Sequence, residues 1–424
     1  MRQSLSLIAF FVITIGVSAQ DFQYAKEIVR VLASDEYFGR GYVHDGDKIA
    51  AEFIASEYEK LGLERFKKSY FQRFTTPVNT FPDKMELTLD GKKLLAGVDF
   101  LIDPGSPGIS GNFETISLSI EDILDRRKLI QTLNNSVNKF IVMPHYSKFK
   151  YDKDEQQKID ETFRFLKYRP ENPSQGSIFL TKNKLTWGGS TAQYGKPSFA
   201  VLDSLDRPIK SVKVDVNAKF IPNYKTQNVL GYLKGQTSDS TIFLVGHYDH
   251  LGMMGQDAVF SGANDNASGI AMLLSLAKYF KENTPKYDMV FVAFGGEELG
   301  LLGSRYFVEN PLSDLSAIKF LLNFDISGTG DDGIQVVNGK VFKGDFDKLV
   351  AINESQKLLK QVKIRGEACN SDHCFFYGKD VPCFFIYTLG GIQAYHDIYD
   401  RSETLPLTEF EDYFSLMVAF IKQL

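Results

Sequence analysis

From Thr226 onward the sequence alternates short, continuous apolar runs with segments of helical periodicity, and this alternation constrains the fold more than any other feature. The apolar runs are TIFLVG (241–246), MVFVAF (289–294), FLLNF (320–324) and CFFIY (383–387). One helical face between the first two runs is apolar, with Ile270, Leu273, Leu274, Ala277 and Phe280. Strands that are apolar on both sides must be covered on both faces, which is typical of parallel sheets. We therefore predict an α/β fold with a mostly parallel central sheet flanked by helices.

Residues 74–223 have a different pattern. MELTLDGKKLLAGVDFLI alternates around an Asp90-Gly91 hairpin signal, and the short strand candidates KFIVM, SIFL, SFAVL and VKVDV follow it. We predict a small β-rich inserted domain over 74–223, which leaves 20–73 and 224–424 for the principal domain. Within the first of these ranges, residues 48–61 are predicted to be a helix that ends at Gly62.

The first nineteen residues have the features of a secretory signal peptide. Arg2 precedes an apolar run from Leu5 to Val17, and Val17-Ser18-Ala19 is a small-residue cleavage site. This run is shorter than the about 20 residues that a membrane-spanning helix needs. We predict cleavage of residues 1–19 and a secreted or periplasmic protein, with an uncleaved membrane anchor as the weaker alternative.

Composition excludes some partners. The chain of 424 residues is 43% hydrophobic, which is enough for a large core, and its net charge is −5. Basic and acidic residues are interspersed, so we expect no nucleic-acid partner and, after signal cleavage, no membrane partner. The sequence sets no oligomeric state.

The three cysteines are Cys369, Cys374 and Cys383. In an oxidising compartment Cys369 and Cys374 could close a small disulfide loop. Buried free thiols in an apolar segment are an equally good interpretation.

Five short polar motifs occur in order along this region, and four of them directly follow a predicted strand or lie one short loop after it. They contain His247 with Asp249 in GHYDHLG, Asp265 in GANDNASG, Glu297 with Glu298 in GGEELG, Asp325 in NFDISG, and His396 in AYHDIYD. In open α/β sheets, sites form beyond the carboxyl ends of the strands, so the fold would bring these side chains together. Histidine nitrogen and carboxylate oxygen are ligands that suit a catalytic zinc.

A pair of metal ions about 3.5–4 Å apart needs one bridging carboxylate and separate ligands for each ion. Asp265 lies in a glycine-rich turn and is the predicted bridge. His247 and Asp325 would complete one zinc site, and Glu298 and His396 the other, which gives two zinc ions per chain.

Adjacent glutamates point in different directions, so Glu297 and Glu298 should have different roles. We assign Glu298 as a ligand and Glu297 as the general base that takes a proton from water and passes it to a leaving amine. Asp249 is placed to accept the other imidazole N–H of His247 and so to orient the ring. His250 is predicted to be neither a ligand nor an orienting partner.

Each motif alone has an ordinary structural explanation. Asp265 could cap the following helix, Glu297 and Glu298 could favour a helix N-terminus, and Asp325 could be a turn residue. Five such coincidences in order at strand ends are far less probable than one site.

The ordered motifs resemble those of the secreted co-catalytic zinc aminopeptidases, metallopeptidase family twenty-eight, whose relatives include glutamate carboxypeptidases and glutaminyl cyclases. The resemblance covers about residues 24–71, with LASDEYFGRG, and 226 to the C-terminus. It implies an aminopeptidase with the phosphorylase/hydrolase-like fold that acts on peptides with a free N-terminus. It also implies the same ligands, base and orienting residue that the motifs themselves suggest.

The resemblance adds three weaker candidates. Tyr395 would donate a hydrogen bond to the oxyanion, and the alternative is a buried packing tyrosine. Asp372 and His373, in SDHCFF, would lie on the substrate side, although His373 could equally be an ordinary loop histidine. The insertion weakly resembles a degenerate protease-associated domain, and nothing in it looks catalytic. His145 within it and His44 before it both lack ligand spacing.

Other functions are possible on the same fold. A glutaminyl cyclase-type acyltransferase would keep one zinc, and a carboxypeptidase would attack the other end of the peptide. A receptor-like binding domain would be expected to have lost ligands, and none of the predicted ligands is missing.

Overall fold

A computed structural model describes residues 19–202 and 208–424 of the chain. Apart from Ala19, the predicted signal peptide lies outside the described residues. No helix among the described residues is both long and apolar enough to span a membrane.

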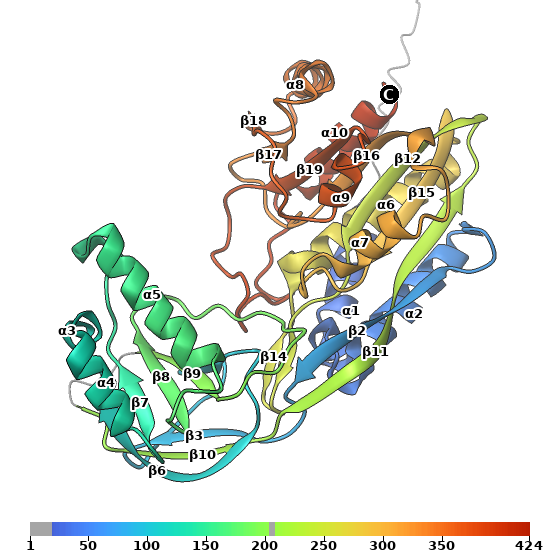
Figure 1. The fold of residues 1–424 in the computed structure, drawn as a ribbon. Coiled ribbons are helices and arrows are strands. Elements are labelled where there is room, and N and C mark those ends of the chain that lie inside the picture. Colours follow the sequence, from blue (N-terminus) through green and yellow to red (C-terminus); the bar gives the residue numbers. More distant parts are fainter. Residues whose placement is uncertain (1–18, 203–207) are drawn as a thin grey trace, which may run out of the picture.

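The larger of two main sheets has nine strands in the order β1-β11-β15-β12-β16-β19-β17-β18, with β2 also paired to β11 (Figure 1). Its strands are β1 (Glu64–Arg65), β2 (Phe71–Thr80), β11 (Lys219–Leu233), β12 (Thr237–His247), β15 (Tyr287–Phe294), β16 (Ile318–Phe324), β17 (Ile334–Val337), β18 (Val362–Ile364) and β19 (Cys383–Thr388). The four central strands β15, β12, β16 and β19 are parallel. On either side of these four strands the pairing becomes antiparallel, between β11 and β15 and between β17 and β19. The four predicted apolar runs are these four central strands, so the α/β fold is confirmed.

Helices cover both faces of this sheet. They are α1 (Ala19–Leu32), α2 (Gly46–Lys60), α6 (Ser268–Glu282), α7 (Leu302–Glu309), α8 (Lys343–Gln356), α9 (His373–Tyr377) and α10 (Phe410–Ile421). Ile242 and Leu244 of β12 pack into the core with α1, α2, α6 and α10, whereas Phe243 and Val245 pack with α7 and α9. This alternation is the period-2 pattern of a strand that is buried on both sides.

The predicted end of the helix at Gly62 is correct. Gly62 has a φ of +69°, its N–H donates to the Glu59 carbonyl, and the N–H of Leu63 donates to the Tyr58 carbonyl. These two bonds form a Schellman motif, which satisfies the last carbonyls of α2.

The second main sheet has eight strands in the order β4-β3-β10-β6-β7-β8-β9-β5. They are β3 (Met85–Leu89), β4 (Lys92–Leu94), β5 (Phe100–Ile102), β6 (Ile109–Ser117), β7 (Phe140–Met143), β8 (Gly176–Thr181), β9 (Ser198–Leu202) and β10 (Ser211–Val216). The predicted hairpin at Asp90-Gly91 joins β3 to β4. This region is less purely β than its sequence indicated, because α3 (Ile120–Leu124), α4 (Arg126–Asn134) and α5 (Lys153–Tyr168) pack on one face.

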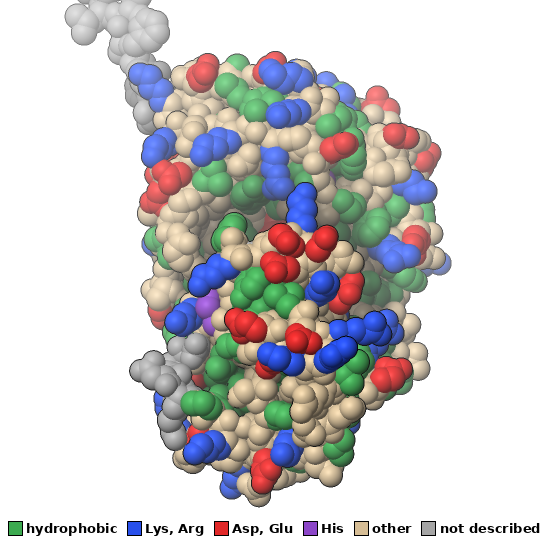
Figure 2. Space-filling model, turned by 60° about the vertical axis from the view of Figure 1, so that its left-hand side comes forward, with side chains coloured by type: hydrophobic (Ala, Val, Ile, Leu, Met, Phe, Trp, Pro, Cys, Tyr) green, Lys and Arg blue, Asp and Glu red, His purple; other side chains and the backbone are tan. Residues whose placement is uncertain are grey.

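The two long strands β2 and β11 run from the larger sheet toward the second one (Figure 1). The predicted domain boundaries lie within these strands at facing positions, since Phe74 is opposite Thr226 and Thr76 is opposite Tyr224. We propose the pair as the connection between the predicted domains. On the face drawn in Figure 2, acidic and basic side chains are interspersed, and the surface is hollowed between the upper and lower parts.

A small hairpin and short helical turns complete the described elements. They are β13 (Gly252–Met254), β14 (Ala258–Phe260), η1 (Asp35–Arg40), η2 (Val43–Asp45), η3 (Lys148–Lys150), η4 (Ala263–Ala267) and η5 (Leu315–Ala317).

Candidate metal centre

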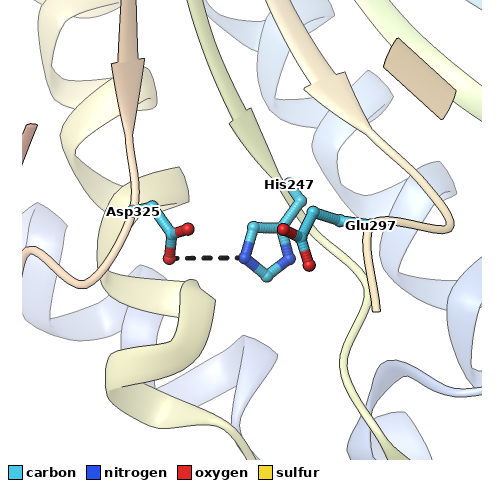
Figure 3. Close-up of side chains that lie close together, drawn as sticks. All are labelled: His247, Glu297 and Asp325. Atoms are coloured by element: carbon cyan, nitrogen blue, oxygen red, sulfur yellow. Dashed lines mark hydrogen bonds and ion pairs between the residues drawn. The ribbon is translucent and has the colours of Figure 1, made fainter. Parts of the chain in front are cut away.

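The predicted site residues converge at the carboxyl edge of the parallel strands. His247 ends β12, Asp325 directly follows β16, and Glu297 follows β15 after two glycines (Figure 3). Asp265 comes from η4, the turn that leads into α6. The parallel strands thus deliver these side chains to one place, as the motif positions predicted.

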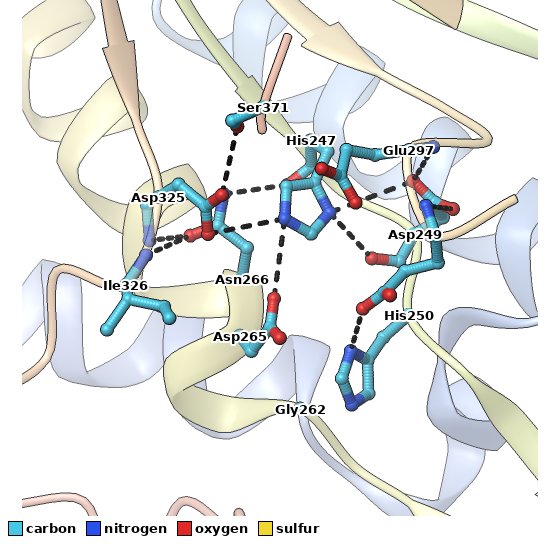
Figure 4. A network of polar contacts seen from close by, with 12 residues as sticks. His247, Asp249, His250, Gly262, Asp265, Asn266, Glu297, Asp325, Ile326 and Ser371 are labelled. Carbon is cyan, nitrogen blue, oxygen red and sulfur yellow. Dashed lines mark hydrogen bonds and ion pairs between the residues drawn. The ribbon is translucent and has the colours of Figure 1, made fainter. Parts of the chain in front are cut away.

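Asp265 lies between two histidines. Its Oδ1 is 3.3 Å from Nε2 of His247, and its Oδ2 is 3.1 Å from Nε2 of His396. The same nitrogen of His247 is 3.4 Å from Oδ1 of Asp325, and the same nitrogen of His396 is 3.3 Å from Oε2 of Glu298. Two ligand groups therefore share one carboxylate (Figure 4 shows the His247 side).

These distances fit a pair of zinc sites. Ligand atoms 2.0–2.2 Å from a tetrahedral zinc ion lie roughly 3.3–3.6 Å from one another. The four distances from the two histidines to the three carboxylates, between 3.1 and 3.4 Å, are close to this range. Nδ1 of His247 is 3.1 Å from the backbone oxygen of Asp249, and Nδ1 of His396 is 3.0 Å from that of Trp187. A carbonyl can only accept, so each Nδ1 carries the proton and each Nε2 is free to bind metal.

The electrostatics of the group follow from its burial and crowding. Burial disfavours the charged forms, yet hydrogen bonds to Asp265 and Glu298 raise the pKa of His396 to about 11. Against the same effect of burial, His250 and His396 lower the pKa of Glu298 to about 2. Cationic charge is therefore strongly favoured among these carboxylates, as expected for residues that could hold a metal.

Glu297 and Glu298 point to different parts of the centre. Glu298 contacts His250 and His396, whereas a Glu297 oxygen lies within 4.8 Å of ligand atoms of His247 and Asp325. Burial, reinforced by Glu298 and opposed by His247, raises the pKa of Glu297 well above its usual value. This separation agrees with the different roles that the sequence suggested.

Asp249 supports the two glutamates more directly than it supports His247. Its carboxylate accepts hydrogen bonds from the backbone N–H of Glu297 at 3.0 Å and of Glu298 at 3.3 Å, and from the Tyr42 hydroxyl. The distance from that carboxylate to Nδ1 of His247 is 3.8 Å, so the backbone carbonyl of Asp249 is the acceptor instead. The expected orienting bond therefore comes from the main chain of Asp249.

His250 belongs to the centre, although the sequence prediction set it aside. Its side chain is fully buried, and its Nδ1 lies 2.8 Å from Oε1 of Glu298. Together with Asp265 and Glu298 it forms a group that could hold a metal. We favour His396 as the ligand, because its Nε2 lies 3.1 Å from Asp265 and 3.3 Å from Glu298, whereas the close contact of His250 is the 2.8 Å one to Glu298.

A cavity of about 380 Å³ opens over this centre. Tyr395 lines it, and its ring stacks on that of His396 with centroids 4.0 Å apart. Tyr395 is 47% exposed, so it is not the buried packing tyrosine of the alternative interpretation.

The structure gives Asp372 and His373 no place on the wall of this cavity. Both are fully buried, and the lining from this part of the chain comes from Arg365 and Asn370 instead. Nε2 of His373 contacts the Ala368 carbonyl at 2.8 Å, and burial lowers the pKa of His373 to about 4. Both residues therefore lie in the interior behind the cavity wall, at the start of α9, and their substrate-side role stays a prediction.

The cysteine question is resolved at the same segment. Cys369 and Cys374 form a disulfide, and Cys383 is a buried free thiol. The closed loop contains Ser371, whose hydroxyl donates to Oδ2 of Asp325 at 3.0 Å. The disulfide thus encloses a residue that orients a predicted ligand.

Arg40 is a supporting residue that the sequence analysis did not identify individually. It lies in the LASDEYFGRG segment, is fully buried, and donates five hydrogen bonds to backbone carbonyls. The acceptors are the carbonyl oxygens of Leu32, Tyr248, Ser261, Gly262 and Asp265. Burial lowers the pKa of Arg40 to about 10, so the guanidinium stays charged at neutral pH and ties together the loops of His247 and Asp265.

The turn of Asp265 is held by two further polar residues. Asp400 accepts the backbone N–H groups of Asn264 and Asp265 at 2.8 and 3.0 Å. Asn266 donates to the carbonyls of His247 and Phe324, and so connects the turn to the ends of β12 and β16. Both are polar residues inside the NDNASG and YHDIYD motifs, which was the available sequence signal.

The region of the second sheet contributes to the centre through residues 184–187. The N–H of Trp187 donates to the His396 carbonyl at 2.9 Å, and the Trp187 carbonyl accepts from Nδ1 of the same histidine. Lys184 forms an ion pair with Asp397 at 2.5 Å and donates to the carbonyls of Gln393 and Tyr395. A predicted insertion with no candidate for chemistry therefore orients a predicted ligand.

Comparisons with known proteins agree with this geometry. Residues 228–421 match the model of peptidase family M28. A stretch of 114 residues is 38% identical to a probable zinc metalloprotease of Pyricularia oryzae, and 115 residues are 34% identical to aminopeptidase YwaD of Bacillus subtilis. Each alignment covers 26% of this chain and 23% or 24% of the relative, so the match spans about a quarter of the length of these relatives.

The solved structure of a zinc aminopeptidase from Bacillus subtilis has the same fold. It aligns with a TM-score of 0.66 at 19% identity, over 95% of this chain and 94% of the other. The resemblance of the fold thus includes the second sheet. The family match and the motifs that it contains show that residues 228–421 are a peptidase family M28 domain.

Proposed function

We propose that this protein is a secreted or periplasmic metallopeptidase that hydrolyses the N-terminal peptide bond of its substrates with a water activated by two zinc ions. The observation that carries the proposal is the position of Asp265, whose two carboxylate oxygens face two different histidines. The similarity to proteins named zinc metalloprotease and aminopeptidase supports it.

In this proposal five side chains would hold the metals. Asp265 would be shared, His247 and Asp325 would complete one site, and Glu298 and His396 would complete the other. Two bound zinc ions would lower the pKa of a water and polarise the scissile carbonyl. The chain keeps the ligands in place through Arg40, Asp400 and the backbone oxygens that fix both imidazoles.

Glu297 acts as the general base. It takes a proton from the attacking water and returns it to the amine that leaves. Its backbone N–H is bound by Asp249, which holds the glutamate beside His247 and Asp325. Tyr395 donates its O–H to the oxygen on which negative charge develops, since the phenol lies at the cavity wall on top of His396.

The change Glu297→Gln tests this proposal. We expect the variant to retain its zinc and to lose about 10²–10⁴-fold in turnover of leucine p-nitroanilide, because an amide cannot accept the proton. Metal content and kinetics are measured on the same sample. Glu282→Gln, at the exposed end of α6, is the matched control and should keep full activity. Undiminished activity of Glu297→Gln would remove this residue from the mechanism.

Metal counting and a substrate panel test the remaining parts. We expect two zinc ions per chain at full activity, and a single zinc would favour the acyltransferase alternative. Peptides with a free amine should be cleaved and N-blocked peptides should not. Cleavage of N-blocked peptides from the C-terminus would instead identify a carboxypeptidase.

A further inference from the structure

The cavity over the metal centre has a cation in its wall. Most of its titratable lining is acidic or histidine, from Asp265, Glu297, Glu298, Asp325, His247 and His396, but Arg365 also lines it. The mechanism proposed above gives this guanidinium no role.

Arg365 is held by regular structure. It directly follows β18, where its N–H donates to the Val336 carbonyl at 2.9 Å and its own carbonyl accepts from Lys340 at 3.1 Å. Its Nη1 donates to the hydroxyl of Tyr387 on β19 at 3.1 Å, and Tyr387 also lines the cavity. These contacts within the protein hold the guanidinium of Arg365 at the edge of the sheet.

Among the described residues, no carboxylate lies within ion-pair distance of Arg365. By contrast, Arg30 pairs with Glu27, Arg305 pairs with Glu309, and the buried Arg40 donates to five backbone carbonyls. Arg365 is half-buried and has only the neutral phenol of Tyr387. A partly buried charge without an opposite partner is unfavourable unless a ligand supplies one.

We propose that Arg365 binds a carboxylate of the substrate and makes the enzyme selective for peptides that carry one close to the cleaved bond. With Nη1 on Tyr387, the planar guanidinium still has donors at Nε and Nη2, and this is the geometry that carboxylates accept. The cavity of about 380 Å³ is near the lower end for ligand pockets, which suits a short peptide. This inference rests on the proposed peptidase function.

Two sources could supply the carboxylate, and the test separates them. Leu-Gly against Leu-Gly-amide tests the α-carboxylate of a dipeptide, and Glu-Gly-amide against Gln-Gly-amide tests an acidic side chain at the N-terminal position. In one of these pairs the acid should be favoured by about 10- to 100-fold in kcat/KM, which is the effect of one charge-assisted contact. Arg365→Met should reduce that ratio to near one. Lys363→Met removes an exposed positive charge two residues earlier, on β18, and should keep the ratio.

The outcomes separate this inference from the proposed function. An enzyme that cleaves both members of each pair equally, or an Arg365→Met variant that keeps the preference, overturns the role of Arg365 and leaves the peptidase intact. If the wild type cleaves none of these peptides, calorimetric binding to zinc-loaded Glu297→Gln decides the point. Equal affinity for acid and amide with and without Arg365 would then overturn the inference.

Discussion

Single side chains at the centre stabilise several loops at once, and Arg40 is the clearest case. Its five acceptors lie at Leu32, at Tyr248 and within residues 261–265, and the farthest of them is 225 residues from Arg40 in the sequence. A buried guanidinium that is bonded in this way supplies hydrogen-bond donors to buried carbonyl oxygens in place of water. The predicted metal ligands His247 and Asp265 both lie on loops that it contacts.

The change Arg40→Met should therefore destabilise the protein strongly. We expect a loss of about 3–5 kcal/mol in the free energy of unfolding, because buried carbonyls lose their donors, together with weaker zinc binding. Urea unfolding and zinc titration measure the two effects. Arg30→Met, which breaks only an exposed pair with Glu27, should leave the stability nearly unchanged. A similar small effect for Arg40→Met would contradict this account.

At the scale of elements, the loop of His396 is fixed by a segment from the region of the second sheet. Trp187 anchors that segment, since its indole Nε1 donates to the Ile102 carbonyl and its ring packs near Phe260. Lys184 then neutralises the buried Asp397 beside His396. The position of one predicted zinc ligand consequently depends on residues more than 200 positions away in the sequence.

We expect Lys184→Met to weaken one of the two zinc sites selectively. Asp397 would lose its cation and the loop its two carbonyl contacts, and loss of such outer support typically costs about 10–100-fold in metal affinity. Zinc titration should show the site of Glu298 and His396 weakened and the site of His247 and Asp325 unchanged. Lys182→Met removes an exposed charge two residues earlier and serves as the control. Equal weakening of both zinc sites would contradict a selective effect of Lys184 on the site of His396.

At the scale of the whole molecule, the central sheet ends in a crowded group of buried carboxylates. Asp249, Asp265, Asp325 and Asp400 are all buried, and Glu297 and Glu298 adjoin them. Their mutual repulsion opposes folding unless histidines or metal ions supply positive charge. The metals should therefore contribute to the stability of the fold as well as to the chemistry.

Removal of zinc should accordingly lower the thermal stability. For zinc at roughly 1,000 times its dissociation constant the stabilisation is about 4 kcal/mol, which for a chain of this length corresponds to a fall in Tm of about 4–5 °C on chelation. Differential scanning calorimetry before and after chelation measures this shift, and added zinc should reverse it. An unchanged Tm would mean that the centre holds no metal that matters for folding.

Much of the fold could be predicted because its signals are local. The apolar runs at 241–246 and 289–294 are strands in the structure. The helix end at Gly62 and the hairpin at Asp90-Gly91 lie where their residue types suggested. The candidate ligands could also be predicted from the sequence, because polar residues at the carboxyl ends of parallel strands lie at one edge of the sheet. Their roles as ligands, like the domain boundaries, stay predictions that the experiments above address.

The sequence by itself determined the α/β class and the chemical nature of the centre, since periodicity and residue type do not depend on distant partners. Only the tertiary structure decided the burial of Asp372 and His373, the contact of His250 with Glu298, and the support from Arg40 and Trp187. These depend on which side chains meet across long stretches of chain. No local sequence pattern predicts these long-range contacts, because they follow from the packing of whole elements.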